Sequence, residues 1–279
     1  MPKEASLSQL VDKYFYTHQF PTMWCPGCGN GTTAMAMVRA IDRLGLDFDK
    51  VIHVAGIGCA CVAHWYTTFS ALQTAHGRAL ASATGIKLGN PELTVVVTLG
   101  DGDCAAIGGN HLIHACRRNI DLTAIVYNNF NYGMTGGQVG PTTPLEAITS
   151  TAPYGNLEPP FDLCKLAEAA GASYVARGTV YHIRELIKLI ERGIKHKGFS
   201  FIDVLTPCPT VFGRRNKAGT PGQMFRDQKD LTVPVKQAGE MLPPEMQGKL
   251  ARGILMEKDT PEFTEEYEKL IARAQNRSG

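Results

Sequence analysis

The sequence predicts an α/β fold with a doubly wound, mostly parallel sheet. Short apolar runs alternate with amphipathic stretches of helical length between residues 30 and 206. The run 93–99, LTVVVTL, is almost continuously β-branched and apolar, which is typical of a parallel strand covered on both faces. The stretches between such runs are long enough for the helical crossovers that parallel strands require.

Each element is predicted from its own pattern. Apolar residues recur at helical spacing over 32–45, and Gly45 is a natural C-terminal cap for that helix. A strand over 50–56 and a helix over 76–91 precede the buried strand 93–99. The later elements are helices over 108–119, 161–171 and 182–196, strands over 122–128, 173–177 and 200–206, and a loop rich in Gly, Pro and Thr over 129–160.

The alternating pattern stops at Pro207. Residues 213–279 are polar, with several prolines and one amphipathic stretch, TEEYEKLIARAQ. We therefore predict one α/β domain over 1–212, followed by a peripheral C-terminal extension over 213–279. We expect this extension to pack on the same chain or on a partner subunit.

The composition is that of an ordinary globular chain. The 279 residues carry a formal net charge of +2, so no strong field attracts nucleic acid. Neither a long apolar run nor an N-terminal signal pattern is evident, so we expect a cytoplasmic protein. Cytoplasmic thiols are usually reduced, and the eight cysteines therefore favour metal ligation or burial over disulfide pairing.

Unusual residues follow four predicted strands at the point where each strand ends. The segments are 57–59 (IGC), 100–103 (GDGD), 129–138 (NFNYGMTGGQ) and 207–209 (PCP). Ligands of open α/β sheets bind outside the carboxyl ends of the strands. We therefore expect these segments to form one site at one edge of the sheet.

The GDGD segment has the composition of a Mg²⁺–diphosphate site. Asp101 lies between two glycines, so its carboxylate can ligate Mg²⁺ while the bare backbone admits a phosphate group. Asn129, at the end of the next strand, offers a second oxygen ligand. The loop 132–138 fits a segment that surrounds the diphosphate with backbone N–H groups. The alternatives are a simple turn for GDGD and a flexible surface loop for 132–138.

Taken in order, the motifs WCPGCG, GIGC, HGRA, GDGD-x₃-IGGNH and NN-x₂-YGMTGGQ-x₂-PTTP resemble the β subunit of 2-oxoacid:ferredoxin oxidoreductases. The 2-oxoglutarate branch is the closest match, and the resemblance spans residues 15–215. It implies thiamine diphosphate, Mg²⁺ and one [4Fe–4S] cluster. It also implies oxidative decarboxylation of a 2-oxoacid, best 2-oxoglutarate to succinyl-CoA, with coenzyme A. Electrons would pass through the cluster to ferredoxin, and the reaction would be reversible as reductive carboxylation.

The resemblance assigns roles residue by residue. It implies Mg²⁺ ligation by Asp101, Asn129 and the main-chain oxygen of Asn131. The implied cluster ligands are Cys25, Cys28, Cys59 and Cys208. The implied cofactor-binding residues are Cys59, His76, Gly100, Asp101, Gly102, Asp103, Asn129, Tyr132, Gly133, Met134, Thr135 and Gly136. His64, His76 and Arg78 are the candidate catalytic residues of this chain, because the activating glutamate is expected on a partner subunit.

The residues themselves support this choice of cysteines. A cubane cluster takes four thiolates, usually from glycine- and proline-rich loops, and the four implied ligands lie in such loops. Cys116 and Cys164 fall inside predicted helices, where burial is the better interpretation. Cys61 remains an alternative to Cys59, and Cys104 is not excluded. Zinc on the same thiolates also stays open, whereas a thioredoxin-type disulfide at CPGC fits the context less well.

Partners and substrate are less determined by the sequence. The chain is too short for a second α/β domain, so we expect an α subunit that carries the glutamate, in an αβ or (αβ)₂ complex. Val62 stands three residues after Cys59. The 2-oxoglutarate members of the family that the chain resembles often carry a basic residue at this position, suited to a distal carboxylate. His64 or the α subunit could supply that charge, or the substrate is another 2-oxoacid such as pyruvate or a branched-chain or aryl acid. A non-redox thiamine enzyme with structural zinc and a cluster-binding scaffold without thiamine are the competing functions.

Overall fold

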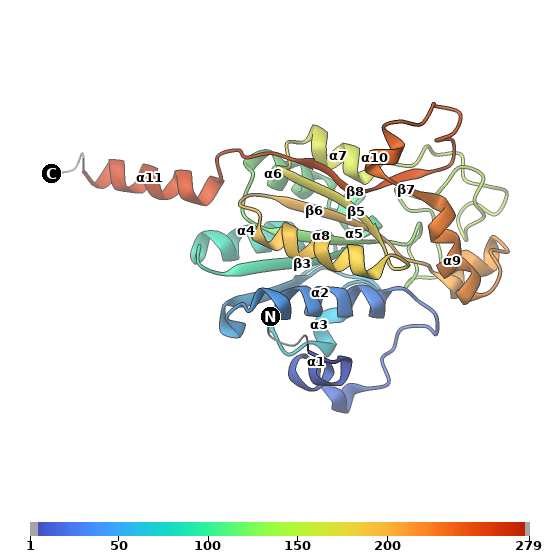
Figure 1. The fold of residues 1–279 in the computed structure, drawn as a ribbon, viewed down its shortest axis with the longest axis horizontal. Helices are drawn as coiled ribbons and strands as arrows, with labels where there is room; N and C mark the ends of the chain where they lie inside the picture. Colours follow the sequence, from blue (N-terminus) through green and yellow to red (C-terminus); the bar gives the residue numbers. More distant parts are fainter. Residues whose placement is uncertain (1–4, 277–279) are drawn as a thin grey trace.

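A single eight-stranded sheet organises the chain, as the computed structural model of residues 5–276 shows (Figure 1). The strand order is β2-β1-β3-β4-β6-β5-β8-β7. The strands are β1 (Val51–Ala55), β2 (Ser70–Gln73), β3 (Thr94–Gly100), β4 (Thr123–Asn128), β5 (Tyr174–Thr179), β6 (Ser200–Leu205), β7 (Thr232–Pro234) and β8 (Leu250–Glu257). All neighbours from β2 to β5 pair in parallel, and only the β5–β8 pair is antiparallel. The predicted fold class is confirmed.

Helices cover both faces of the sheet. On one face pack α1 (Leu7–Tyr14), α2 (Asn30–Leu44) and α8 (Ile183–Lys195). On the other face pack α4 (Ala79–Gly89), α6 (Gly109–Arg118) and α7 (Leu163–Ala169). Because successive side chains of a strand point to opposite faces, Val96 of β3 joins the first core, and Val95 and Val97 join the second. This two-sided burial explains the continuous apolar run of β3.

The short elements lie mainly around the sheet ends. They are α3 (Ala63–Tyr66), α5 (Asp101–Ala105), α9 (Pro221–Leu231), α10 (Val235–Ala238), the 3₁₀ turns Thr17–Gln19 and Phe48–Lys50, and a π-helical turn over Pro209–Gly213. The helix α11 (Phe263–Gln275) extends away from the body of the protein (Figure 1).

The predicted helices and strands between 30 and 206 are confirmed, with ends that shift by at most three residues. Gly45 caps α2 in the left-handed conformation, with φ of 60°, as its position predicted. The loop over 129–160 contains neither helix nor strand.

The C-terminal extension differs from its sequence-based description in one respect. Beyond residue 212 the chain contributes β7 and β8, which lengthen the main sheet beside β5. β7 has only three residues, and Arg252 and Gly253 interrupt the apolar pattern of β8, so neither strand was evident in the sequence. The edge strand β2 was also missed, because its residues are exposed and show no apolar run. Within residues 5–276, no helix is both long and apolar enough to cross a membrane.

Candidate active site and thiol cavity

The strand-end segments meet because their strands are neighbours. β1, β3, β4 and β6 lie side by side and parallel, so their carboxyl ends face the same edge of the sheet. The segments that follow these strands line two adjoining cavities. The expectation of one site at one sheet edge is therefore confirmed in its geometry.

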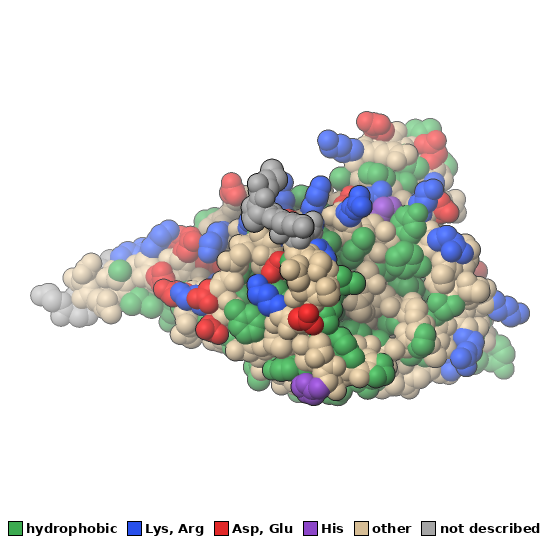
Figure 2. Space-filling model, turned by 60° about the horizontal axis from the view of Figure 1, so that its bottom comes forward, with side chains coloured by type: hydrophobic (Ala, Val, Ile, Leu, Met, Phe, Trp, Pro, Cys, Tyr) green, Lys and Arg blue, Asp and Glu red, His purple; other side chains and the backbone are tan. Residues whose placement is uncertain are grey.

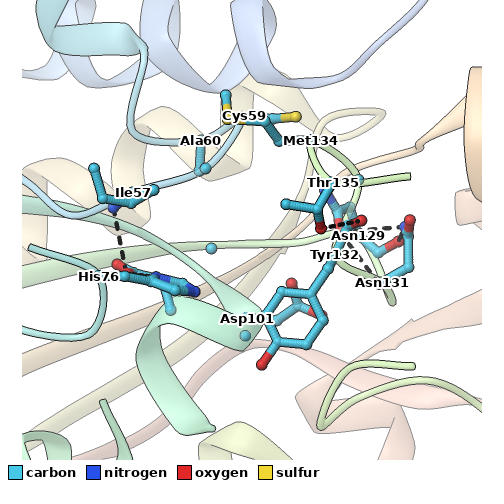
Figure 3. A pocket seen from close by; sticks show the side chains of 15 residues that line it. Ile57, Cys59, Ala60, His76, Asp101, Asn129, Asn131, Tyr132, Met134 and Thr135 are labelled. Carbon is cyan, nitrogen blue, oxygen red and sulfur yellow. Dashed lines mark hydrogen bonds and ion pairs between the residues drawn. The ribbon is translucent and has the colours of Figure 1, made fainter. Parts of the chain in front are cut away.

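The first cavity, of about 100 Å³, lies over the ends of β3 and β4 (Figure 3). It is lined by Ile57, Gly58, Cys59, Ala60, His76, Gly100, Asp101, Gly102, Asp103, Asn129, Asn131, Tyr132, Gly133, Met134 and Thr135. Every residue named above as a cofactor contact except Gly136 is among them. Ile57 and Gly58 belong to the predicted strand-end segment 57–59, and Ala60 is a lining residue that the sequence did not single out.

Asp101 is buried, with only 2% of its surface exposed. Burial raises the pKa of its carboxyl to about 7, while the Thr142 hydroxyl, 2.5 Å from Oδ2, opposes that shift. A buried carboxylate is costly unless it is paired or coordinates a metal. A divalent cation beside Asp101 would supply the missing positive charge, so this carboxylate suits a Mg²⁺ ligand.

Asn129 and Asn131 add oxygen atoms beside Asp101. The backbone N–H of Asn131 donates to Asn129 Oδ1 at 3.3 Å, and Asn131 Nδ2 donates to the Asn129 carbonyl at 2.8 Å. The side-chain oxygen of Asn131 is buried without a hydrogen-bond partner. A buried acceptor that is left unpaired costs free energy. This atom therefore indicates that the cavity is completed by a donor or a cation.

The loop after Asn131 closes over the GDGD segment through a close approach. A Cβ atom at Gly102 would lie 2.2 Å from the Tyr132 ring, so only glycine allows Tyr132 to pack here. The loop is held as a turn by the Gly137 N–H, which donates to the Tyr132 carbonyl at 2.9 Å. Gly136 adopts φ of 109°, which favours glycine. The composition of this loop follows from these requirements.

Asp103 and His76 form a hydrogen-bonded pair at the cavity wall. Asp103 is buried, and its Oδ1 accepts from His76 Nδ1 at 2.5 Å and from the Gly77 N–H at 2.7 Å. The Ile57 N–H donates to the same oxygen at 3.3 Å. The carboxylate thus joins the loops after β1 and β2 and fixes the imidazole.

The second cavity, of about 230 Å³, is lined by four thiols. Its residues are Met23, Trp24, Cys25, Cys28, Cys59, Val62, Asn129, Gly133, Met134, Cys208, Pro209, Thr210 and Val211. The other four cysteines are buried and do not line it. Cys61 instead directs its thiol toward the Thr98 carbonyl and Asp103. The geometry therefore gathers the four cysteines that the resemblance implied.

Burial and mutual proximity govern the chemistry of these thiols. Burial raises the pKa of Cys28 to about 12 and that of Cys59 to about 11, and the neighbouring cysteines add to both shifts. All eight cysteines are free. Thiols with raised pKa values ionise only if a cationic group compensates the thiolate charge, which a metal centre does.

The four thiols line a cavity and do not converge on one point. In the part of the chain that the structure describes, no group of three or more His, Cys, Asp or Glu side chains converges as single-ion ligands do. In a [4Fe–4S] cubane each iron takes one thiolate, so the four sulfur atoms surround a volume rather than a point. A cavity of about 230 Å³ between four thiols fits that requirement.

Three predicted residues lie outside both cavities. His64 Nδ1 lies 2.5 Å from the Cys61 carbonyl, and burial lowers its pKa. Arg78 is directed to the His76 and Ile107 carbonyls. Gly136 lines neither cavity, and its carbonyl accepts from Arg215 at 3.3 Å. Their proposed roles therefore gain no support from the cavity geometry. Thr142, which contacts Asp101, lies in the PTTP part of the quoted motifs, but the sequence assigned it no role.

Comparison with known proteins gives a consistent result. The model of the thiamine pyrophosphate enzyme C-terminal TPP binding domain matches residues 47–204. The chain is 47% identical over 267 residues to 2-oxoglutarate synthase subunit KorB of Methanothermobacter thermautotrophicus, covering 96% of this chain and 92% of that protein. It is 58% identical over 197 residues to subunit KorB of Archaeoglobus fulgidus, covering 71% and 73%.

A solved structure is also similar. It is 2-oxoglutarate:ferredoxin oxidoreductase from Magnetococcus marinus with 2-oxoglutarate, coenzyme A and succinyl-CoA bound. The TM-score is 0.85 at 32% identity, and the match covers 95% of this chain and 90% of that chain. The similarity thus includes the C-terminal strands as well as the matched domain.

Proposed function

Because the chain belongs to the family of 2-oxoacid:ferredoxin oxidoreductase β subunits, which includes 2-oxoglutarate synthase subunit KorB, we propose that it catalyses the thiamine diphosphate-dependent oxidative decarboxylation of 2-oxoglutarate. Coenzyme A accepts the acyl group as succinyl-CoA, and ferredoxin accepts the electrons. The reaction is reversible as reductive carboxylation. One observation carries this proposal: the two cavities share Cys59, Asn129, Gly133 and Met134, so the cofactor site and the thiols adjoin.

The first cavity is the proposed cofactor site. Asp101, Asn129 and the main-chain oxygen of Asn131 would hold Mg²⁺, which in turn would hold the diphosphate. The backbone of Gly100 and Gly102 and the loop 132–136 would surround the phosphates. When bound, thiamine diphosphate supplies a carbanion equivalent for attack on a 2-oxo carbon. The chain itself orients the cofactor and restricts water, because the Tyr132 ring lies over the backbone of Gly102.

The second cavity is the proposed cluster site, with Cys25, Cys28, Cys59 and Cys208 as ligands. Gly133 lines both cavities and has no side chain, so the proposed cluster site and the proposed cofactor site are in close contact there. A Cβ atom placed on Gly133 would lie 3.6 Å from the sulfur atoms of both Cys59 and Cys208. A cluster in this position would lie next to the cofactor, as electron transfer between them requires. Structural zinc on the same thiols is the second candidate and would imply a non-redox thiamine enzyme.

A partner α subunit is the expected source of the activating glutamate. Neither cavity contains a glutamate. Seen from the α1 side, the surface carries several apolar side chains with charged side chains between and around them (Figure 2). Tyr16, Phe20, Met23 and Trp65 are exposed large apolar residues of the segments around α1 and α3. A partner subunit that covers such residues would complete the site between the two chains.

Substrate choice rests mainly on the relatives. The solved relative has 2-oxoglutarate bound, and the KorB proteins are named for it. In this chain the apolar Val62 lines the thiol cavity at the position where a basic residue would suit 2-oxoglutarate. His64, the other candidate for that charge, lies outside the cavity. We therefore place the group that binds the distal carboxylate on the α subunit. Pyruvate and branched-chain or aryl 2-oxoacids are the competing substrates.

The first experiment is elemental analysis of the complex purified without oxygen. We expect about four iron and four sulfide per copy of this chain, after clusters on partner chains are subtracted. Zinc without sulfide would contradict the redox function and leave a thiamine enzyme. Binding of Mg²⁺–thiamine diphosphate by calorimetry and turnover with 2-oxoglutarate against pyruvate then test the cofactor and the substrate separately.

A further inference from the structure

The hydrogen bond between Asp103 and His76 has a consequence for the proposed cofactor site. We infer that Asp103 is a positioning residue that keeps the His76 proton on Nδ1, so that Nε2 is presented to the bound cofactor or its substrate adduct as a hydrogen-bond acceptor. This inference rests on the proposed function and names a further residue of the same site. It follows from the contacts of both side chains.

In the hydrogen bond between His76 and Asp103, the imidazole is the donor. A carboxylate only accepts hydrogen bonds, so the nitrogen that lies 2.5 Å from Asp103 Oδ1 is the one that carries hydrogen. A neutral imidazole has one N–H, and its other nitrogen is then an acceptor. Nε2 of His76 therefore lacks hydrogen in the neutral ring.

The Asp103 carboxylate is held in place by several contacts. Asp103 Oδ1 also accepts from the Gly77 and Ile57 N–H groups, and its side chain is 1% exposed. A Cβ atom at Gly56 would lie 1.9 Å from Asp103 Oδ2, so the loop after β1 approaches this carboxylate without a side chain. Three donors and a glycine contact leave Asp103 little freedom to move.

The His76 ring forms part of the wall of the first cavity. His76 lines the first cavity together with Asp101 and Tyr132, and its side chain is 35% exposed. The Tyr132 ring stands nearly perpendicular to it, with centroids 6.2 Å apart. The charged group nearest to His76 on its own loop, Arg78, is directed to backbone carbonyls. The partly exposed ring thus belongs to the cavity wall, while the buried carboxylate supports it from behind.

A footprint tests the orientation without measuring turnover. The purified complex, stripped of cofactor, is treated with diethylpyrocarbonate, which acylates a bare imidazole nitrogen, and each histidine is followed by mass spectrometry. We expect Mg²⁺–thiamine diphosphate to slow modification of His76 at least about tenfold, as a blocked acceptor would. His111 of α6, which is partly exposed and lines neither cavity, is the reference whose rate stays unchanged, and buried His53 stays unmodified throughout. Equal His76 rates with and without bound cofactor would overturn the inference.

Variants test the role of Asp103. Asp103→Asn keeps an oxygen acceptor for the Ile57 and Gly77 amides but removes the charge. We expect kcat to fall about 10- to 100-fold while the Kd for thiamine diphosphate changes little. The matched control Asp259→Asn, at an exposed position that lines neither cavity, leaves both unchanged. An Asp103→Asn enzyme with unchanged kcat would overturn the inference.

Chemical rescue separates positioning from a purely structural effect. Added imidazole restores turnover to His76→Ala but much less to the double variant His76→Ala/Asp103→Asn, because only Asp103 orients the added ring. Equal rescue of both variants would contradict a positioning role. A wild-type complex that fails to bind thiamine diphosphate would instead overturn the proposed function, so the two failures are distinguishable.

Discussion

The indole N–H of Trp24 donates a 2.8 Å hydrogen bond to the backbone carbonyl of Cys59. Trp24 directly precedes Cys25, whereas Cys59 follows β1, so this bond joins two loops that are distant in sequence. The Trp24 ring also packs against Tyr66, with centroids 5.2 Å apart. The loop that carries Cys25 and Cys28 is thereby tied to the loop that carries Cys59.

Replacement of Trp24 by Phe should loosen the thiol cavity. The change removes a hydrogen bond worth about 1 kcal/mol and leaves the Cys59 carbonyl without that donor. We expect a complex that retains its fold but holds less iron and sulfide and loses them faster in air. Trp65→Phe is the matched control, because the exposed Trp65 lines neither cavity. If both variants keep wild-type iron content over time, the Trp24–Cys59 bond has no part in preforming the site.

Cys59 and Cys61 should respond differently to substitution by Ser. Cys59 lines the thiol cavity, whereas the Cys61 thiol is buried against the Thr98 carbonyl. We expect Cys59→Ser to lose most iron and Cys61→Ser to keep it, with both contents measured after anaerobic purification. The reverse result would identify Cys61 as the ligand and would require the loop after β1 to rearrange.

Much of the parallel core was predictable because its strands and helices have distinct apolar periods. β3 is buried on both faces, and α2 has an apolar stripe closed by Gly45, so local pattern and tertiary packing agree. The sheet-edge rule then located Asp101, Asn129 and Cys208 without any knowledge of their contacts. These residues lie together because β3, β4 and β6 are neighbours in the folded sheet.

The missed features depend on long-range contacts. β8 pairs with β5 although its residues are only partly buried, and its pattern resembles a surface loop. Thr142 belongs to a loop with no periodicity, and only the folded loop places its hydroxyl near Asp101. Asp103 was expected to contact the cofactor, and its support of His76 could not be read from a spacing of 27 residues.

Thr142→Val should weaken binding of Mg²⁺ and thiamine diphosphate. Burial raises the pKa of Asp101 to about 7, and the Thr142 hydroxyl opposes that shift by stabilising the carboxylate. Its removal raises the Asp101 pKa further, so a larger fraction of Asp101 is protonated near neutral pH and unable to ligate a cation. As the pH is lowered, we expect the cofactor affinity of the variant, measured by calorimetry, to begin to fall at a higher pH than that of the wild type. Thr142→Ser keeps the hydroxyl and should behave as the wild type, and a valine variant with an unchanged pH profile would contradict this role.

His53 should make the folded state less stable in mild acid. The imidazole is buried between the Thr67 and Thr98 hydroxyls, at 3.2 and 2.9 Å, and burial lowers its pKa from 6.5 to about 3. The unfolded state therefore binds a proton below pH 6.5 that the folded state refuses until about pH 3. The stability that neutral His53 contributes is fully present above pH 6.5. It is lost by up to about 1.4 kcal/mol per pH unit as the pH falls from 6.5 toward about 3.

The measurement compares urea unfolding of the wild type and of His53→Gln between pH 7 and pH 5. Glutamine keeps hydrogen-bonding groups between the two threonines but does not titrate in this range, so its variant lacks the His53 contribution. The other histidines are common to both proteins, and the difference between the two stability curves isolates His53. We expect this difference to change steadily below pH 6.5 in favour of the variant. Parallel curves would show that His53 takes up a proton inside the folded core as readily as in the unfolded chain.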